Sequence, residues 1–527
     1  MSFKRLLILS GIILAVAIAG FSWNYAFRGH RGPATPGKAT TFYDGPVDSN
    51  GYLDFYAAYN DYQHEQIKPE DNAAYQLLLA VGPEASEMTE NFKLRWQILT
   101  ADLDPEDPLG QIPADHRFLQ SLDNFVNESD PEIDAEILEQ YDGDKAFYTF
   151  ERLDECYEKP WAGSDYPIID AWIDANRESL ELVIEGTGKP DFWAPAVPLT
   201  VPTGNTVASL IECDLSEIQK MREAARCLVA RAMRSLAEGD VEAAQSDLIA
   251  TRRLGLLLTE RGSLVQSLVG LAIQGIAFQS ETAMLQLGQL SPEQIQDYLD
   301  LVAGLPAGGT LARNVHIDER TMGLSAIQQQ YADKQNFDLN LALSIANEFY
   351  DKLAAAAQDP PDPAAQQWIE QRLAEIEDRS AAGFVMSGLF GGRPGRTKMT
   401  TEVMMAMLLP AVDSVADAYK RSAVQAELIL IALELETHKN QHGSYPDRLE
   451  DIEDRIAEQI GDRFDESGAS LRYSTTPSGY LLYSIGVDGI DSGGVTYGEQ
   501  STNSAFSGDD IRVCIGEFEP AAQPSDQ

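Results

Sequence analysis

The feature that most constrains the fold of this chain is a helical pattern of apolar residues between residues 214 and 306. Its first part places apolar side chains on one face, at steps of three or four residues. These side chains are Leu215, Ile218, Met221, Ala225, Leu228, Ala232 and Leu236. Gly239 then suits the end of one helix, and Asp240 suits the N-cap of the next. The pattern predicts a helical hairpin that turns at these two residues.

Two further helices follow from the same reasoning. Segment 263–287 is apolar nearly all round, which predicts a helix buried between neighbours. The sequence Ser-Pro-Glu-Gln at 291–294 supplies an N-cap, a proline at the first helical position and a capping-box glutamine. The hairpin at Gly239 resembles a tetratricopeptide-type helix pair, but only one copy is evident, whereas stable arrays need about three. We therefore expect a helical-hairpin domain rather than a repeat solenoid.

The chain as a whole, 527 residues long, is predicted to be mainly α-helical. Proline, glycine and aspartate break residues 51–200 into short amphipathic segments, which predicts an irregular helical region. Residues 201–398 form the expected helical-hairpin domain. Residues 399–516 are expected to form one long helix and a small α+β domain, because the strand-like segments LRYSTT and GYLLYSIG follow residue 470. Residues 517–527 are expected to be a disordered tail.

The N-terminus predicts export. Lys4 and Arg5 precede an apolar run, so residues 1–23 are interpreted as a membrane anchor or a signal segment. Ala17-Ile18-Ala19 offers a cleavage site, whereas the aromatic residues after it are typical of an interfacial belt and favour an uncleaved anchor. Residues 24–50 are rich in Gly, Pro and Thr and are expected to be a flexible linker. The expected location is the cell envelope, with a single-pass anchor in the inner membrane and the body exported. The alternative is a secreted or periplasmic protein after signal cleavage.

The charge of the chain limits its partners. The formal net charge is −44, although residues 1–40 contain five Lys and Arg residues and no acid. A body this acidic repels the phosphates of nucleic acids, so we expect no nucleic-acid partner. A protein partner, not identified by the sequence, and the membrane at the N-terminal anchor are the expected contacts. The acidity itself is interpreted as a means of solubility in a salty, extracytoplasmic setting.

Export also permits disulfides. The four cysteines are Cys156, Cys213, Cys227 and Cys514. A helix that begins near Leu215 would place Cys227 roughly 18 Å from Cys213, which exceeds the Cα separation of about 7 Å that a bridge can span. We therefore expect Cys156 to pair with either Cys213 or Cys227. The sequence has no CxxC pair, so it does not indicate a zinc or thioredoxin-like site.

The C-terminal region, about residues 415–515, has a distinctive order of segments. The sequence ALELETHKNQHGSYPDRLEDI at 432–452 joins the end of a long helix to a turn, a Tyr-Pro pair and a short helix. Two strand-like segments follow, then SIGVDG at 484–489 and GDDI at 508–511. This order resembles the soluble part of the major pseudopilins of type II secretion. The resemblance implies a pseudopilin-like α+β domain with a calcium-binding loop.

The candidate metal ligands lie in that loop. They are the carboxylates of Asp488, Asp491, Asp509 and Asp510 and the backbone carbonyls of Ile485 and Ile490. The resemblance implies all of these except Asp491, which has no counterpart in the family. Calcium prefers six to eight oxygen ligands from carboxylates and carbonyls, and the glycines of the loop permit the tight turns that such a site needs. We therefore predict a structural calcium ion.

The chain departs from the pseudopilin pattern in two respects. An insertion at 492–507 lengthens the loop. Pseudopilins carry a cleavable prepilin leader directly before their hydrophobic helix, whereas here the apolar segment begins at residue 6 and the pseudopilin-like helix lies about 400 residues later. We therefore do not expect processing or polymerisation as a pilin. The whole chain also resembles a family of uncharacterised, anchored bacterial envelope proteins, which implies no activity.

Common catalytic motifs are missing from the sequence. It contains no GxSxG, HExxH or GxxxxGK[ST] motif and no strand-bound GxGxxG. The leading hypothesis is therefore a non-catalytic scaffold or interaction protein of the bacterial envelope, and not an enzyme. One alternative is an accessory component of a type II secretion-like system. The other is an enzyme whose site is assembled from scattered acidic residues of the helical domain.

Overall fold

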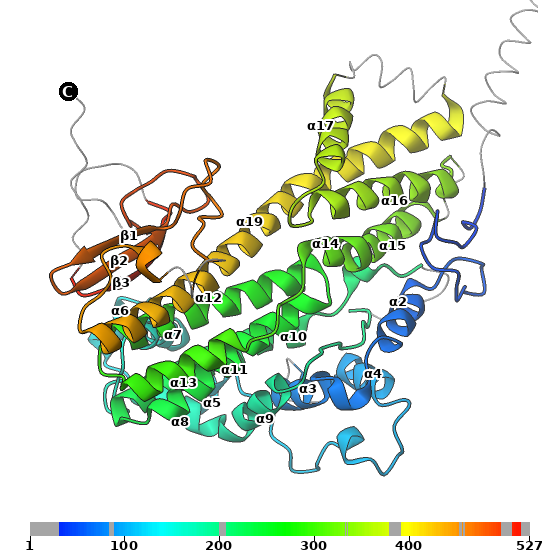
Figure 1. The fold of residues 1–527 in the computed structure, drawn as a ribbon. Coiled ribbons are helices and arrows are strands. Elements are labelled where there is room, and N and C mark those ends of the chain that lie inside the picture. The colour runs from blue at the N-terminus through cyan, green and yellow to red at the C-terminus, as the bar shows by residue number, and fades with distance from the viewer. Residues whose placement is uncertain are drawn as a thin grey trace, which may run out of the picture.

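The computed structural model describes residues 31–83, 89–199, 207–332, 334, 336–378, 391–452, 456, 459–496 and 508–517. The protein is mainly helical and has a small three-stranded antiparallel sheet near its C-terminus (Figure 1). The predicted fold class is confirmed at this level. The apolar segment 1–23, the first part of the expected linker and the tail beyond residue 517 lie outside the described residues.

Short helices joined by long connections make up residues 51–199. They are α2 (Phe55–His64), α3 (Ala74–Val81), α4 (Glu90–Leu99), α5 (Leu122–Ser129), α6 (Ala135–Glu139), α7 (Lys145–Glu158), α8 (Pro167–Ala175) and α9 (Arg177–Thr187). Several begin at a side chain that accepts a hydrogen bond from a backbone N–H of the first turn, as Asp54, Thr89 and Asp144 do. Local capping therefore explains why the helices start where they do.

The predicted hairpin is confirmed. It consists of α10 (Ser216–Glu238) and α11 (Val241–Glu260), and α12 (Leu264–Gln286) and α13 (Pro292–Ala303) follow it. Gly239 ends α10 with a φ of 84°, and the Asp240 side chain accepts a hydrogen bond from the Ala243 N–H. Ser291 and Gln294 form the expected capping box at the start of α13. Helix α12 is buried over most of its length, as its apolar sequence predicts.

The second half of the helical body ends in one very long helix. The elements are α14 (Leu311–Asn314), a π-helical segment (Val315–Glu319), α15 (Arg320–Tyr331), α16 (Leu339–Ala356), α17 (Pro363–Glu377) and α19 (Gly392–His442). The expected domain boundary between residues 398 and 399 therefore falls inside α19. Figure 1 shows this helix crossing the molecule from the end that carries α17 to the end that carries the sheet.

The sheet has the strand order β1-β2-β3, with β1 (Arg472–Thr476), β2 (Gly479–Ser484) and β3 (Ile511–Ile515). Both strand-like segments predicted from the sequence are confirmed by β1 and β2. Gly479 permits the close pairing of β2 with β3, because a Cβ at this position would lie 2.0 Å from the carbonyl oxygen of Ile515. The short helix expected after Tyr445 is a single 3-10 turn at Leu449–Ile452.

The buried apolar residues form two clusters that do not follow the chain order. One contains residues of α3–α13 together with the second half of α19 and the sheet, and the other contains residues 34–58, α15, α16 and the first half of α19. The Gln286 side chain of α12 also donates a hydrogen bond to the Cys514 carbonyl oxygen of β3, at 3.0 Å. The sheet is therefore built onto the helical body through a common core.

Two expectations from the sequence are corrected. The expected linker 24–50 is packed onto the body from residue 34 onward: Ala34, Thr41 and Tyr43 are buried, and the Tyr43 hydroxyl lies 2.8 Å from that of Thr321. Long-range contacts of this kind have no local sequence signal. All four cysteines are free thiols, so the predicted disulfide of Cys156 is absent.

Two of the described helices, α12 and α19, are long and apolar enough to cross a membrane by length and composition. Two thirds of the most apolar stretch of α12 is buried within the body. Such burial is also typical of a core helix. The segment predicted from the sequence to be the anchor precedes the described residues.

Candidate cation site at the C-terminal loop

The candidate site is the connection between β2 and β3, which leaves the sheet after Ser484 and returns to it at Ile511. Gly486 has a φ of 71°, and a Cβ there would lie 2.0 Å from the carbonyl oxygen of Asp509. A Cβ at Gly508 would lie 2.1 Å from the carbonyl oxygen of Val495. The two ends of the loop are therefore pressed together, backbone against backbone, as only glycine allows.

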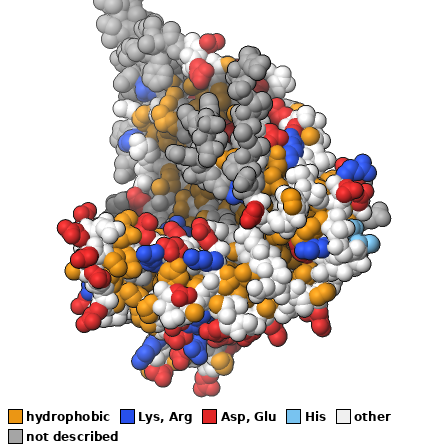
Figure 2. Space-filling model, turned by 90° about the vertical axis from the view of Figure 1, so that its left-hand side faces the viewer, with side chains coloured by type: hydrophobic (Ala, Val, Ile, Leu, Met, Phe, Trp, Pro, Cys, Tyr) orange, Lys and Arg blue, Asp and Glu red, His pale blue; other side chains and the backbone are white. Residues whose placement is uncertain are grey.

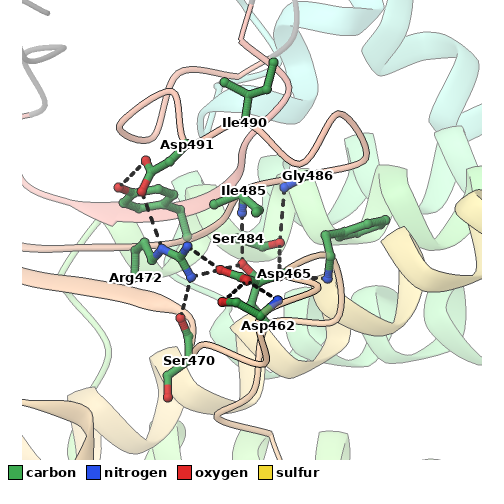
Figure 3. A network of polar contacts seen from close by, with 12 residues as sticks. Asp462, Asp465, Ser470, Arg472, Ser484, Ile485, Gly486, Ile490 and Asp491 are labelled. Atoms are coloured by element: carbon green, nitrogen blue, oxygen red, sulfur yellow. Dashed lines mark hydrogen bonds and ion pairs between the residues drawn. The ribbon is translucent and has the colours of Figure 1, made fainter.

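A buried aspartate fixes the start of the loop (Figure 3). The Asp462 carboxylate accepts hydrogen bonds from the Ser484 hydroxyl at 2.7 Å, the Ile485 N–H at 3.0 Å and the Phe464 N–H at 3.1 Å. The Arg472 guanidinium of β1 lies 3.8 Å from the same carboxylate. Ile485 is consequently held in place by Asp462, through its backbone N–H.

Arg472 links this network to the predicted ligand Asp491. Its guanidinium donates to Asp465 at 2.6 Å, to the Ser470 carbonyl oxygen at 2.7 Å and to Asp491 at 3.4 Å. The Asp491 carboxylate also accepts a hydrogen bond from the Tyr483 hydroxyl at 2.9 Å. These two contacts tie the tip of the loop to the first two strands.

The neighbouring predicted ligands face solvent. The Asp488 carboxylate accepts a hydrogen bond from the N–H of Ile490 at 2.9 Å, which closes a local turn. The Ile490 side chain is 60% exposed. In Figure 3 it points away from the Asp462 network.

Asp509 is paired with a cation of the protein itself. Its carboxylate accepts hydrogen bonds from the Arg421 guanidinium at 2.6 Å and from the Val487 N–H at 2.9 Å. Arg421 belongs to α19, so this ion pair attaches the returning end of the loop to the long helix.

Asp510 has a different environment. The residue is 2% exposed, and its carboxylate accepts hydrogen bonds from the N–H groups of Gly494 at 2.6 Å and Ser492 at 3.4 Å. Burial raises the pKa of Asp510 to about 6, with smaller contributions from the nearby carboxylates of Asp491 and Asp488 and against the lowering effect of the two N–H donors. Among the described residues, Asp510 has no basic partner.

The predicted ligands therefore all lie in one loop, but they are not arranged around a common point as the ligands of a metal ion are. Within the described part of the chain, no three His, Cys, Asp or Glu side chains converge as they would around one ion. The donors suit calcium chemically, yet Asp509 and Asp491 are engaged by arginines and Asp510 by backbone N–H groups. The carboxylates would have to exchange some of these partners in order to bind an ion.

The sequence analysis missed the residues that organise the loop, namely Asp462, Asp465, Arg472 and Arg421. A basic residue inside a predicted strand of a very acidic chain, as Arg472 is, weakly indicates an ion pair with an acidic residue of the same chain. Asp462 and Arg421 have no local signal for this role, because their partners in the loop are 22 to 88 residues away along the chain.

A small crevice lies between the irregular region and the helical hairpins. Tyr59, Arg95, Asp214 and Glu217 are among its lining residues, and its volume is about 60 Å³. Sites for small organic ligands usually have volumes of about 300–1,000 Å³. Arg95 and Glu217 form a buried ion pair with each other. Because its volume is small, the crevice offers room for water rather than for a substrate.

The surface around the sheet carries mixed charge. Figure 2 shows acidic and basic side chains interspersed over this face, without a continuous basic patch.

Comparison of the chain with family models, with curated proteins and with solved structures gives no match.

Proposed function

We propose that the protein is an anchored, exported component of the bacterial envelope that acts as a non-catalytic scaffold or interaction module. The observation that carries this proposal is the common core of the sheet and the helical body. A long helix that joins both ends of the molecule, with a sheet built onto it, makes a rigid support for binding partners rather than a pair of domains that close on a substrate.

The buried charges support a structural role. Arg252 forms a bidentate ion pair with Glu281, whose carboxylate also accepts a hydrogen bond from the Tyr298 hydroxyl at 2.6 Å. All three residues are fully buried or nearly so. Their hydrogen-bonding groups are directed at one another, so they hold α11, α12 and α13 together and are closed to a reacting molecule.

Photo-crosslinking in cells tests the scaffold proposal. A photoreactive residue would replace Phe147, Ile211 or Val265 in the full chain, because these apolar side chains are 52%, 62% and 49% exposed. Arg448, whose side chain is 70% exposed, provides a charged control position. A scaffold predicts discrete protein adducts from at least one apolar position and none from the control. The absence of adducts from all three positions contradicts the proposal.

We further propose that a structural calcium ion binds the loop between β2 and β3. The carboxylates of Asp488 and Asp491 support this proposal, because they raise the pKa of Asp510 and a cation would relieve this repulsion. Binding of an ion to the folded state alone would stabilise the protein. Thermal melts with calcium, magnesium and chelator test this. The proposal predicts a calcium-specific rise in Tm that Asp488→Ala abolishes, and an unchanged rise in that variant refutes the ligand assignment.

A second candidate function is an accessory role in a type II secretion-like system. The path of the chain after α19 favours it, because the Tyr-Pro turn is packed against the sheet. The Tyr445 ring meets that of Tyr480 edge to face at 4.9 Å, and the Tyr473 hydroxyl donates to the Pro446 carbonyl oxygen at 2.9 Å. Isolation of the full chain from envelope extracts of its host tests this role. Recovery of secretion components supports the role, and their absence leaves the scaffold proposal alone.

A further inference from the structure

A surface groove runs along α11, between α9 and α13. The first part of the groove has a volume of about 520 Å³ and lies between the end of α9, the first half of α11 and α13. The second part, of about 270 Å³, lies between loop 187–190, the second half of α11 and loop 306–308. Both parts are lined by Thr187 and Arg253, so they adjoin.

One face of α11 forms the floor of this groove, which we call the α11 groove. Its lining residues recur at steps of three and four from Glu242 to Glu260. At the helical rise per residue this face is about 27 Å long. Such a length matches about eight residues of extended polypeptide.

Apolar side chains lie on both sides of Arg253 along the floor. Ile249 and Leu257 are buried in it, and Leu256 is half-buried. Leu301 of α13 adds an apolar wall and is 39% exposed. Apolar side chains of a bound segment would therefore be removed from water where they contact these residues.

The charged residues of the α11 groove have a fixed order. Glu242, Glu293 and Asp297 line its first part, Arg253 lies where the two parts meet, and Glu260 lines the second part. Within the described residues, none of these five side chains forms an ion pair, although the chain has 83 acidic residues for 39 Lys and Arg. The order along the floor is thus acidic, basic, acidic.

This order selects the kind of ligand. A small anion at Arg253 or a small cation beside the carboxylates would satisfy only one of these three positions. A polypeptide segment with the complementary order, basic, acidic, basic, satisfies all three positions. Glu242 and Arg253 are about 16 Å apart along α11, and Arg253 and Glu260 about 10 Å. These lengths correspond to about five and three residues of an extended chain.

We propose that the α11 groove binds an extended segment of a partner protein with the pattern basic-x4-acidic-x2-basic, read in either chain direction. The proposal rests on the scaffold function proposed above and names the chemistry of its partner. The experiments distinguish failure of the groove proposal from failure of the scaffold proposal, because crosslinks from Phe147 or Ile211 report partners that bind outside the groove.

Binding of synthetic nonapeptides to the immobilised full chain in detergent tests this proposal. The matched libraries are Lys-X4-Glu-X2-Lys and its reverse order, with X drawn from Ala, Val, Leu, Ser and Thr. The control library inverts every charge, as Glu-X4-Lys-X2-Glu and its reverse. We expect retention of a matched library at least about tenfold above the inverted one, and a loss of that preference at high salt.

Two charge-reversal variants localise the binding. Arg253→Glu should lower retention of the matched library about tenfold and should favour peptides in which Lys replaces the central Glu. Glu293→Lys, at an exposed position of α13, should weaken selection for the terminal Lys without affecting the fold. Arg448→Glu, far from the groove in the chain, is the matched control and should leave binding unchanged. Equal retention of the matched and inverted libraries, retention of neither, or equal binding by wild type and Arg253→Glu overturns the proposal.

Discussion

Helices α11 and α12 approach each other closely at a pair of glycines. A Cβ at Gly270 would lie 2.5 Å from the carbonyl oxygen of Gly255 and 3.0 Å from the side chains of Leu258 and Thr259. A Cβ at Gly255 would lie 2.7 Å from the carbonyl oxygen of Gly270. At Gly270 the nearest obstacle is backbone, which can move only if the two helices separate, whereas at Gly255 the Gln274 side chain is equally close, at 2.6 Å.

Gly270→Ala should therefore destabilise the protein. Ordinary contacts of a Cβ begin near 3.4 Å, so the helices would have to move apart by roughly 0.9 Å at this point. Overpacking of this kind costs about 1–3 kcal/mol or more, and the better helix propensity of alanine returns only about 1 kcal/mol. We expect a net loss of up to about 2 kcal/mol in the free energy of unfolding.

Gly275→Ala is the matched control in the same helix. A Cβ at Gly275 has only the Gln425 side chain nearby, at 4.0 Å. The substitution should therefore stabilise the protein by about 0.5–1 kcal/mol through helix propensity alone. Each variant adds one methyl group to α12, and only the methyl group at position 270 meets α11. The difference between their free energies of unfolding therefore measures the effect of the close contact between the two helices.

Differential scanning calorimetry of the full chain at one scan rate measures the effect. At the usual entropy of unfolding per residue, 1 kcal/mol corresponds to about 1 °C in a chain of this length. We expect Gly270→Ala to lower Tm by up to about 2 °C and Gly275→Ala to raise it by about 1 °C. Equal shifts for the two variants, or a Tm of Gly270→Ala at or above that of wild type, would refute the proposed helix contact.

Three further predictions concern charged side chains and their partners. Glu281→Leu leaves Arg252 buried without its carboxylate and should cost about 3–5 kcal/mol, whereas Arg252→Met combined with Glu281→Leu should recover most of the Tm. Asp510 has a folded-state pKa of about 6, above the ordinary aspartate value of 3.8. Its protonated form is therefore favoured in the folded state, and its contribution to stability falls as the pH rises from about 4 to about 6. In chelator, Asp510→Asn should match wild type below pH 4 and exceed its stability by about 1–3 kcal/mol above pH 6, and a pH-independent difference in Tm contradicts this. Arg421→Ala should release Asp509 and increase hydrogen exchange at residues 508–511, while Tm changes by little more than about 1 °C. Unchanged hydrogen exchange at these residues contradicts the role of this ion pair.

The sequence predicts those parts of the fold that depend on local interactions. Gly239, Asp240, Ser291 and Gln294 act on backbone groups within four residues of themselves, and all four have the predicted roles. The alternation of side chains in β2 likewise identifies a strand. Propensity and capping are properties of a short window, and a single sequence displays them directly.

Long-range contacts account for what the sequence did not predict. The segment expected to be a linker is packed on the body because the Asn347 side chain donates to the Thr40 carbonyl oxygen and the Tyr43 hydroxyl meets Thr321. The loop between β2 and β3 is organised by Asp462 and Arg421, which cannot be selected from the sequence among many acidic and basic residues. Pairings of this kind depend on the tertiary fold, so only a structure can reveal them.

The central claim of this account is that the sheet and the helical body share one core and unfold together. Hydrogen exchange of the full chain measures this most directly, by comparing the amides of β2 with those of α12. We expect both sets to exchange only through global unfolding, with the same free energy of opening and the same dependence on denaturant. Exchange of β2 at a distinctly lower free energy, while α12 stays protected, would show that the sheet is a separate unit and would contradict the account.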